Sequence, residues 1–438
     1  MHFIPQVLFS LLLLATGIVA YRKYSFIRRN ILLGRDETLT GSTSERWKNM
    51  VLFALGQKKM FRNWIPAVLH LFIYVSFVIV NLEVVEIVID GITGSHRILA
   101  APLGGFYTFM ISLIEVLSAA ALLATFAFLW RRNVQKVARF TQPEMKGWPF
   151  KDANLILLFE IVLVTAILSM NAIDYQLHQR GTPHYPDTGN LLLGQYLSNL
   201  FSSIGSNTLI LMERAAWWTH IAGIFFFLLY IPHSKHLHIF LAFPNSFYMR
   251  QDTPKGHMDN MPVIMNEVKT MLDPSAEVTE IANPPKAFGA KDVTDLSWKS
   301  LMDAYSCTEC GRCTAACPAN QTGKQLSPRK IMMDTRDRLE EVGRNIDTKG
   351  TDYDDGKSLL GDYITAEELR ACTTCNACVE ECPVNISPLN IILELRRYQV
   401  MEQSDAPEAW TQMFNNLENN QAPWQFNPED RLKWAEEL

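Results

Sequence analysis

All eight cysteines of this 438-residue chain lie in two copies of one pattern. Each copy reads C-x-x-C-x-x-C-x-x-x-C-P, and the copies occupy residues 307–318 and 372–383. Three cysteines at steps of three residues, then a fourth and a proline, are the spacing that binds a cubane [4Fe–4S] cluster through thiolate sulfur. Structural zinc sites also use C-x-x-C units, but as two separated pairs, so the spacing favours iron–sulfur clusters. The chemistry that the pattern predicts is one-electron transfer.

The two cysteine runs are expected to exchange one ligand each. In proteins with two such clusters, the fourth cysteine of each run binds the cluster of the other run. We therefore assign the first cluster to Cys307, Cys310, Cys313 and Cys382, and the second to Cys372, Cys375, Cys378 and Cys317. No cysteine remains for a disulfide or a reactive thiol. The crossing would tie the two runs into one folding unit, although 54 residues separate Cys317 from Cys372.

Helices are predicted to position both runs. A Ser-Pro pair follows each run, at Ser327-Pro328 and at Ser387-Pro388, and a helix-like stretch follows each pair. Serine at the cap and proline in the first turn are helix-start signals. This half of the chain is therefore expected to be α-helical, unlike the strand-rich small ferredoxins.

Charge and hydropathy divide the chain into two parts. Residues 1–245 carry 20 Lys+Arg and 13 Asp+Glu, a net of +7, whereas residues 246–438 carry 20 and 32, a net of −12. A bilayer-spanning helix needs about 20 apolar residues, and five stretches of the first part reach that length: 3–21, 64–90, 105–130, 151–173 and 213–242. The acidic second part argues against nucleic acid as a partner.

The predicted fold class is all-α. A five-helix transmembrane bundle (1–245), with its N-terminus outside, is followed by a cytoplasmic linker (246–290), an α-helical ferredoxin-like domain with two [4Fe–4S] clusters (291–400) and a C-terminal arm (401–438). The arm, whose residues 415–434 show no strong element, is interpreted either as a docking segment or as a flexible end.

Orientation follows from the basic residues. The predicted loops 22–63 and 131–151 hold 16 Lys+Arg between them, while the other two loops hold only Arg97 and Arg180. Because basic loops stay on the cytoplasmic side, residues 243–438 are expected in the cytoplasm. The first apolar stretch has no charged segment before it, which favours an uncleaved anchor. The predicted location is a bacterial cytoplasmic (inner) membrane.

Histidines inside the predicted spans form a second candidate site, since imidazole in a bilayer is costly and usually functional. His70 and His238 both fall near the cytoplasmic ends of their helices, and this matched depth predicts a bis-histidine heme b. His220 precedes His238 by 18 residues, which is five turns or roughly 27 Å along one helix face, and is a candidate ligand of a second heme. His236 could replace His238 as a ligand. For each histidine, a structural hydrogen bond is the alternative.

Several acidic residues also fall in or near the predicted spans. Glu115 and Glu160 lie mid-helix, where a carboxyl group could move protons to a quinone site or could simply bond to a neighbouring helix. Glu83, Glu86 and Asp174 are expected near the outer helix ends, in contact with water.

Two resemblances extend this interpretation. Residues 217–240, WWTHIAGIFFFLLYIPHSKHLHIF, resemble the last helix of the heme b membrane subunit of respiratory nitrate reductases, in which two heme-binding histidines share the 18-residue spacing. The stretch from Trp64 to His70 is similar to the second helix of that family. The family carries a further histidine ten residues along that helix, partnering the first histidine of the last helix, and this chain has Val80 there. The departure leaves the second heme without a matched ligand pair.

The second part of the chain resembles the di-cluster subunit of heterodisulfide reductases. The resemblance rests on residues 297–319 and 371–388, which contain both cysteine runs. A heme b membrane domain fused to such a domain is similar to the membrane iron–sulfur oxidoreductases of that superfamily, some of which exchange electrons between quinone and electron-transfer flavoprotein. No cysteine follows Cys382, so the resemblance implies that the catalytic module is a separate subunit.

The predicted function is that of a membrane electron-transfer subunit, the quinone-reactive part of an oxidoreductase complex. It would relay electrons between the quinone pool and a cytoplasmic partner through heme b and two [4Fe–4S] clusters. The partners implied are membrane lipid, quinone, and a cysteine-rich iron–sulfur subunit or electron-transfer flavoprotein. No Gly-rich phosphate loop or nucleophile elbow supports NAD, FAD or hydrolase chemistry. The alternatives are a membrane-anchored redox sensor or assembly scaffold, and a complete enzyme acting on a soluble substrate.

Overall fold

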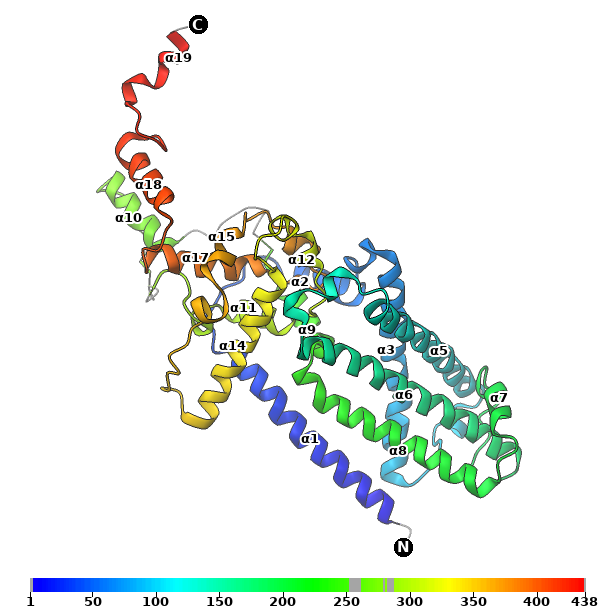
Figure 1. The fold of residues 1–438 in the computed structure, drawn as a ribbon. Coiled ribbons are helices and arrows are strands. Elements are labelled where there is room, and N and C mark those ends of the chain that lie inside the picture. Colours follow the sequence, from blue (N-terminus) through cyan, green and yellow to red (C-terminus); the bar gives the residue numbers. More distant parts are fainter. Residues whose placement is uncertain (1–2, 252–260, 279, 282–286, 437–438) are drawn as a thin grey trace.

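The fold is all-α, as predicted. The computed structural model describes residues 3–251, 261–278, 280–281 and 287–436, and the chain is 71% helical without a strand among these residues. Figure 1 shows a bundle of long helices next to a compact group of shorter helices that carries both cysteine runs. The N-terminus lies at the end of the bundle that is remote from this group.

Five helices are long and apolar enough to cross a membrane, which agrees with the prediction. They are α1 (Ile4–Ile31), α3 (Trp64–Thr93), α5 (Gly105–Asn133), α6 (Trp148–Gln179) and α8 (Ser206–Tyr230). Shorter segments connect them: α2 (Thr43–Asn49), a π-helix at Met50–Leu55, α4 (Ala100–Leu103) and α7 (Gly194–Leu197). Large apolar side chains such as Leu8, Leu123 and Leu211 are exposed on the outside of the bundle, where lipid would cover them.

The last span ends earlier than predicted. Helix α8 stops at Tyr230, two 3-10 turns follow at Ile231–His233 and Lys235–Leu237, and α9 (His238–Phe247) begins a new helix. Pro232 lies in the first turn, and proline inside a helix removes a backbone hydrogen bond and clashes with the preceding turn. The prediction that His220 and His238 share one face of a continuous helix, five turns apart, was therefore wrong.

The cysteine-rich part is built around two capped helices. Its helices are α11 (Trp298–Tyr305), α12 (Arg312–Ala316), α13 (Pro318–Gln321), α14 (Pro328–Lys349), α15 (Ala366–Ala371), α16 (Ala377–Glu381) and α17 (Pro388–Met401). The side chain of Ser327 accepts a hydrogen bond from the Lys330 amide, and that of Ser387 accepts one from the Asn390 amide. Both predicted helix starts are thus confirmed.

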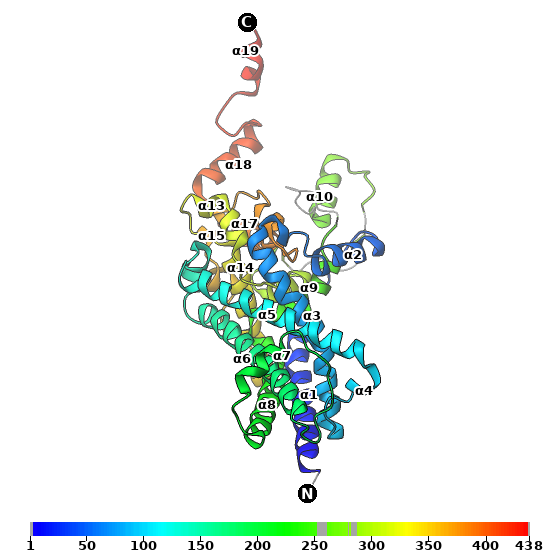
Figure 2. The same ribbon diagram turned by 90° about the vertical axis from the view of Figure 1, so that its right-hand side faces the viewer.

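Two segments stand off the body. Helix α10 (Pro262–Leu272) lies in the predicted linker, of which residues 252–260, 279 and 282–286 are outside the described residues. Helix α18 (Glu408–Asn420) and the short α19 (Lys433–Glu436) form the arm, and both overlap residues 415–434, where no strong element was expected. Trp410, Phe414 and Leu417 recur at the i, i+4, i+7 spacing of one helix face. Helices α10 and α18 overlap in Figure 1 but are well separated in Figure 2.

The two parts of the chain pack directly against each other. At the end of α1, the buried Asn30 amide donates to the Tyr305 hydroxyl at 3.0 Å. Arg35 and the segment before α11 pair through backbone bonds, from the Arg35 amide to the Leu296 carbonyl and from the Trp298 amide to the Arg35 carbonyl. A Cβ at Gly34 would lie 2.6 Å from the Trp298 nitrogen, so this close approach requires glycine.

A buried ion-pair network crosses the same interface. Lys235, from the turn after α8, donates to Glu309 Oε2 at 2.6 Å, and Arg336 of α14 donates to Glu309 Oε1 at 2.8 Å. Burial raises the pKa of Glu309, but Arg336 and Lys235 outweigh this and lower it to about 2. Glu309 stands between two cysteines of the first run, so the network fixes that loop to the membrane part.

Glu309→Gln is expected to destabilise the chain by about 3 kcal/mol, because it removes the shared and closest counter-charge of two buried cations. Thermal unfolding of the purified protein in detergent measures the effect. Glu381→Gln is the matched control, since Glu381 pairs with Arg62 where both side chains are about a third exposed, and such pairs contribute at most about 1 kcal/mol. Equal melting temperatures for the two variants would contradict the role of the network.

Candidate functional site

The two cysteine runs repeat the same backbone geometry. The second residue after the first cysteine has positive φ in both runs, at Glu309 (53°) and Thr374 (57°). The fourth residue after it does as well, at Gly311 (72°) and Asn376 (61°), which are residue types that tolerate this conformation. Each run therefore curls into a loop that gathers cysteines three residues apart before α12 or α16 begins.

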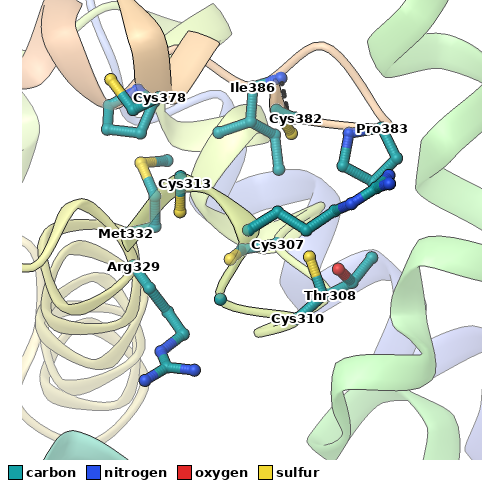
Figure 3. Close-up of a pocket in the computed structure, with 13 residues that line it drawn as sticks. Cys307, Thr308, Cys310, Cys313, Arg329, Met332, Cys378, Cys382, Pro383 and Ile386 are labelled. Carbon is teal, nitrogen blue, oxygen red and sulfur yellow. Dashed lines mark hydrogen bonds between the residues drawn. The ribbon is translucent and has the colours of Figure 1, made fainter. Parts of the chain in front are cut away.

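The first cavity collects thiols from both runs. Its empty volume is about 340 Å³, including space open to solvent, and its walls include Arg312 and Arg329 as well as five cysteines. Figure 3 shows the sulfurs of Cys307, Cys310, Cys313 and Cys382 around a common space, while that of Cys378 points away. The fourth thiol thus comes from the second run, which is the crossing predicted for the first ligand set.

The second cavity has nearly the same size, about 320 Å³, and the complementary composition. Its cysteines are Cys317, Cys372, Cys375 and Cys378. Leu326 and Pro328 at the start of α14, with Leu389 and Ile392 of α17, form an apolar wall. The start of α14 and the first turns of α17 therefore line this cavity, and each predicted ligand set is gathered at one cavity.

The thiols have the surroundings of metal ligands. Burial raises the pKa of the Cys307 and Cys378 thiols to about 12 and that of Cys382 to about 11, so at neutral pH their thiolates need a bound cation. The Ile386 amide donates to Cys382 Sγ at 3.3 Å, and the Thr374 amide donates to Cys372 Sγ at 3.4 Å. Four sulfurs that line a cavity, instead of converging on one point, suit a four-iron cluster better than a single zinc ion.

Three histidines meet at the end of the bundle that faces the cysteine-rich part. His70 Nδ1 donates to Gln57 Oε1 at 3.2 Å, and His238 Nδ1 donates to the Lys235 carbonyl at 2.8 Å. Both rings thereby keep Nε2 free for a metal, which is the usual arrangement of a ligating histidine. The His236 ring is 5.4 Å from that of His238, and burial with the nearby His238, Lys235 and His70 holds the pKa of His236 well below its ordinary value.

His220 has the same arrangement without a counterpart. It is 3% exposed, its Nδ1 donates to the Leu163 carbonyl at 2.9 Å, and its buried Nε2 has no partner. Val80, the position at which the resembling family has a histidine, packs against the apolar cluster that contains Ile221. The residues present therefore fit one heme, whereas a second heme would lack a ligand opposite His220.

A buried polar network at the far end of the bundle was missed by the sequence analysis. Glu83, Glu86 and Asp174 are at most 4% exposed, so the prediction that they contact water was wrong. The reason is Arg97, whose guanidinium donates to Glu83 at 2.6 Å and to Asp174 at 3.0 Å and compensates their burial. Arg97 has a φ of 55° in the loop after α3. The signal in the sequence was Arg97 itself, which is the single Lys or Arg of the outer loop 91–104.

The hydrogen bonds of this network indicate a structural role and not a metal site. His96, Asp174 and Glu213 lie close enough together for a metal ion, but Arg214 donates to His96 Nδ1 at 3.0 Å and leaves Nε2 to donate to Asp174 at 3.1 Å. A cation at Nε2 would force the proton onto Nδ1, facing the guanidinium. Glu115 accepts from the Leu193 and Gly194 amides at 2.8 and 3.1 Å, which supports its structural alternative.

Comparisons with known proteins agree with the cysteine geometry. Residues 306–386 match the family model of the 4Fe-4S dicluster domain. The chain is 28% identical to FadF of Bacillus subtilis, a probable iron-sulfur-binding oxidoreductase, over 96% of this chain and 60% of that protein. It is 26% identical to the EtfAB:quinone oxidoreductase of Syntrophomonas wolfei, over 90% of this chain and 54% of that protein.

A shorter relative matches about a quarter of this chain. It is one of the subunits of a ferredoxin/F(420)H(2)-dependent CoB-CoM heterodisulfide reductase from Methanosarcina acetivorans, 37% identical over 24% of this chain and 53% of that protein. No solved structure matches the chain. This chain spans only 60% and 54% of the two relatives that it matches along most of its own length. Its relatives are iron–sulfur oxidoreductases. The family model places a 4Fe-4S dicluster domain at residues 306–386 of this chain.

Proposed function

We propose that this chain is a membrane electron-transfer subunit that relays electrons between quinone in the bilayer and a partner oxidoreductase in the cytoplasm. The observation that carries the proposal is the placement of two crossed cysteine cavities beside a histidine group at one end of a five-helix bundle. Two [4Fe–4S] clusters and one heme b, when bound, each supply the capacity to accept and release one electron. The residues of the chain hold and space these groups.

The first cavity lies against the membrane part. Arg312 in its wall donates to the Lys59 carbonyl at 3.1 Å, and Arg329 donates to the Arg139 carbonyl at 2.6 Å. Both carbonyls belong to loops that connect the long helices. The second cavity has Cys375 exposed at its rim. The two cavities therefore suit an ordered route between the bundle and a partner, with the first cavity next to the bundle and the second next to the partner.

Lys235 connects the histidine group to the first cysteine loop. Its carbonyl accepts from His238 and so fixes the orientation of that imidazole. Its ammonium binds Glu309, between Cys307 and Cys310. We assign His70 and His238 as the heme ligands, with His236 as the alternative to His238. The short covalent and ionic path through Lys235 holds the heme ligand and the first cavity at a fixed separation.

Orientation and partner follow from charge and from the relatives. The loops that pack on the cysteine-rich part carry most of the basic residues of the bundle, which favours the cytoplasmic side of a bacterial inner membrane. The name of the Syntrophomonas relative includes both EtfAB and quinone. The name of the Methanosarcina relative describes one subunit of a heterodisulfide reductase. We therefore propose a cytoplasmic electron-transfer flavoprotein or cysteine-rich iron–sulfur subunit as the partner.

Quinone is expected to reoxidise the reduced chain. The purified protein is placed in lipid nanodiscs and reduced with a stoichiometric amount of dithionite. Quinone should then restore the oxidised heme absorbance and remove the cluster signal in electron paramagnetic resonance. In His70→Ala, which keeps both cysteine cavities, reoxidation of the clusters should slow at least tenfold. Clusters that reoxidise at the same rate with and without quinone would instead support the redox sensor or scaffold.

A further inference from the structure

The two cysteine cavities differ in charge. The wall of the first contains two arginines, Arg312 and Arg329, which are 7% and 0% exposed. Among the described residues, the wall of the second contains no charged side chain. Each cavity gathers one predicted set of four thiols, and the two cavities have nearly the same size. The arginines in the first wall therefore distinguish the two sites electrostatically.

Most of the positive charge at the first cavity is uncompensated. Arg329 pairs with Glu144 at 2.7 Å, but Arg312 bonds only to the carbonyls of Lys59 and Met60 and to the Met60 sulfur, without an ion pair in the described part of the chain. Lys59 itself donates to the Val379 carbonyl at 3.4 Å, three residues before Cys382. Arg312 lies in the wall of the first cavity and Lys59 lies beside the segment that carries its fourth ligand, so two cations stand near this cavity.

Nearby acids do not cancel this charge. Glu309 is matched by two cations, Lys235 and Arg336. Glu380 and Glu381 share Arg62 at a partly exposed surface, where solvent weakens their field. The first cavity therefore carries a net positive environment.

Arg396 is a cation close to the second cavity, at the backbone of its ligand Cys372. It donates to the Leu369 carbonyl at 2.9 Å and to the Cys372 carbonyl at 2.5 Å, and it has no ion pair among the described residues. The second cavity thus has one cation without an ion pair, Arg396, which lies at the backbone of a ligand. The first cavity has Arg312 in its wall and Lys59 near its fourth ligand.

We propose that Arg312, positioned by the membrane part of the chain, raises the reduction potential of the cluster in the first cavity above that of the cluster in the second. The proposal rests on the proposed function, since it takes both cavities to hold [4Fe–4S] clusters. Reduction adds one negative charge to a cluster. A buried cation stabilises this added charge more strongly than a cation that is exposed to water does. One electron then passes from the reduced second cluster to the oxidised first cluster without a proton. The preferred flow is from the exposed Cys375 side toward the membrane.

A redox titration of the full chain in detergent, followed by electron paramagnetic resonance, tests the proposal. The wild type should show two one-electron steps. Arg312→Gln should lower the higher step and shift the electron distribution between the clusters about tenfold, which is about 59 mV for one electron. Arg312→Lys keeps the charge and should restore the wild-type order. Arg396→Gln is the matched variant at the second cavity and should lower only the lower step.

Several outcomes would overturn the proposal. One is that Arg312→Gln leaves both steps in place, and another is that it lowers the lower step. If Arg312→Gln loses iron, Lys59→Gln replaces it, because Lys59 lies outside both cysteine loops, and an unchanged higher step in that variant counts against the proposal as well. Failure of the proposed function is distinguishable: quinone would not reoxidise the chain, while the two steps and their dependence on Arg312 would remain.

Discussion

Cys317→Ser is expected to remove the iron of the second cavity and to spare that of the first. Cys317 belongs to the first run, but it lines the second cavity with three cysteines of the second run. A hydroxyl is a poor substitute for a thiolate ligand of iron, so a four-iron cluster should be lost. Cluster iron, counted apart from heme iron, should fall from about eight to about four atoms per chain, from two cubanes of four. Iron and sulfide analysis of the purified protein measures the change.

The reciprocal variant supplies the control. Cys382 lies in the second run and lines the first cavity, so Cys382→Ser should also retain about four iron atoms, but in the other cluster. In a redox titration, Cys317→Ser should keep the higher step and Cys382→Ser the lower one. If each variant kept the opposite step while Arg312→Gln still lowered the higher step, each run would hold its own cluster, and the crossed assignment would be wrong. Stoichiometric zinc in either protein would contradict iron ligation altogether.

Features that depend only on residues close together in the sequence could be predicted from it. The spacing of the cysteines depends on short loops, and the same φ signs at Gly311 and Asn376 reproduce one loop twice. Ser327 and Ser387 cap helices that begin one residue later, and a cap needs only its own first turn. The five spans depend on length and hydropathy, which are properties of each segment alone.

Features that depend on contacts between distant segments were not predicted. The break after α8 places Lys235 where it reaches Glu309, 74 residues further along the chain, and the hydrophobic pattern across Pro232 did not indicate it. Arg97 and Asp174 are 77 residues apart, so the burial of Asp174 could not be recognised from its own neighbourhood in the sequence. The aromatic face of α18 is a different case, since the spacing of Trp410, Phe414 and Leu417 was visible and was overlooked.

Replacing either proposed heme ligand, His70→Ala or His238→Ala, is expected to abolish the b-type absorbance of the reduced protein. Each ring has its Nδ1 bonded to a carbonyl oxygen, so each offers only Nε2 to iron, and a bis-histidine site has no spare ligand. Iron bound in the cysteine cavities should stay near eight atoms per chain. Reduced-minus-oxidised spectra, with iron analysis of the same samples, measure both quantities.

His233→Ala is the matched control, because His233 precedes His238 by five residues but is exposed and bonds to Lys23. That variant should keep the full heme signal. His236→Ala decides between the alternative ligands: loss of the signal in His236→Ala with retention in His238→Ala would move the ligand to His236, whose buried Nδ1 has no partner. A signal that survives all three substitutions at positions 70, 236 and 238 would remove heme from this end of the bundle. The cysteine cavities would then have to receive electrons from quinone directly, across the Lys235 interface.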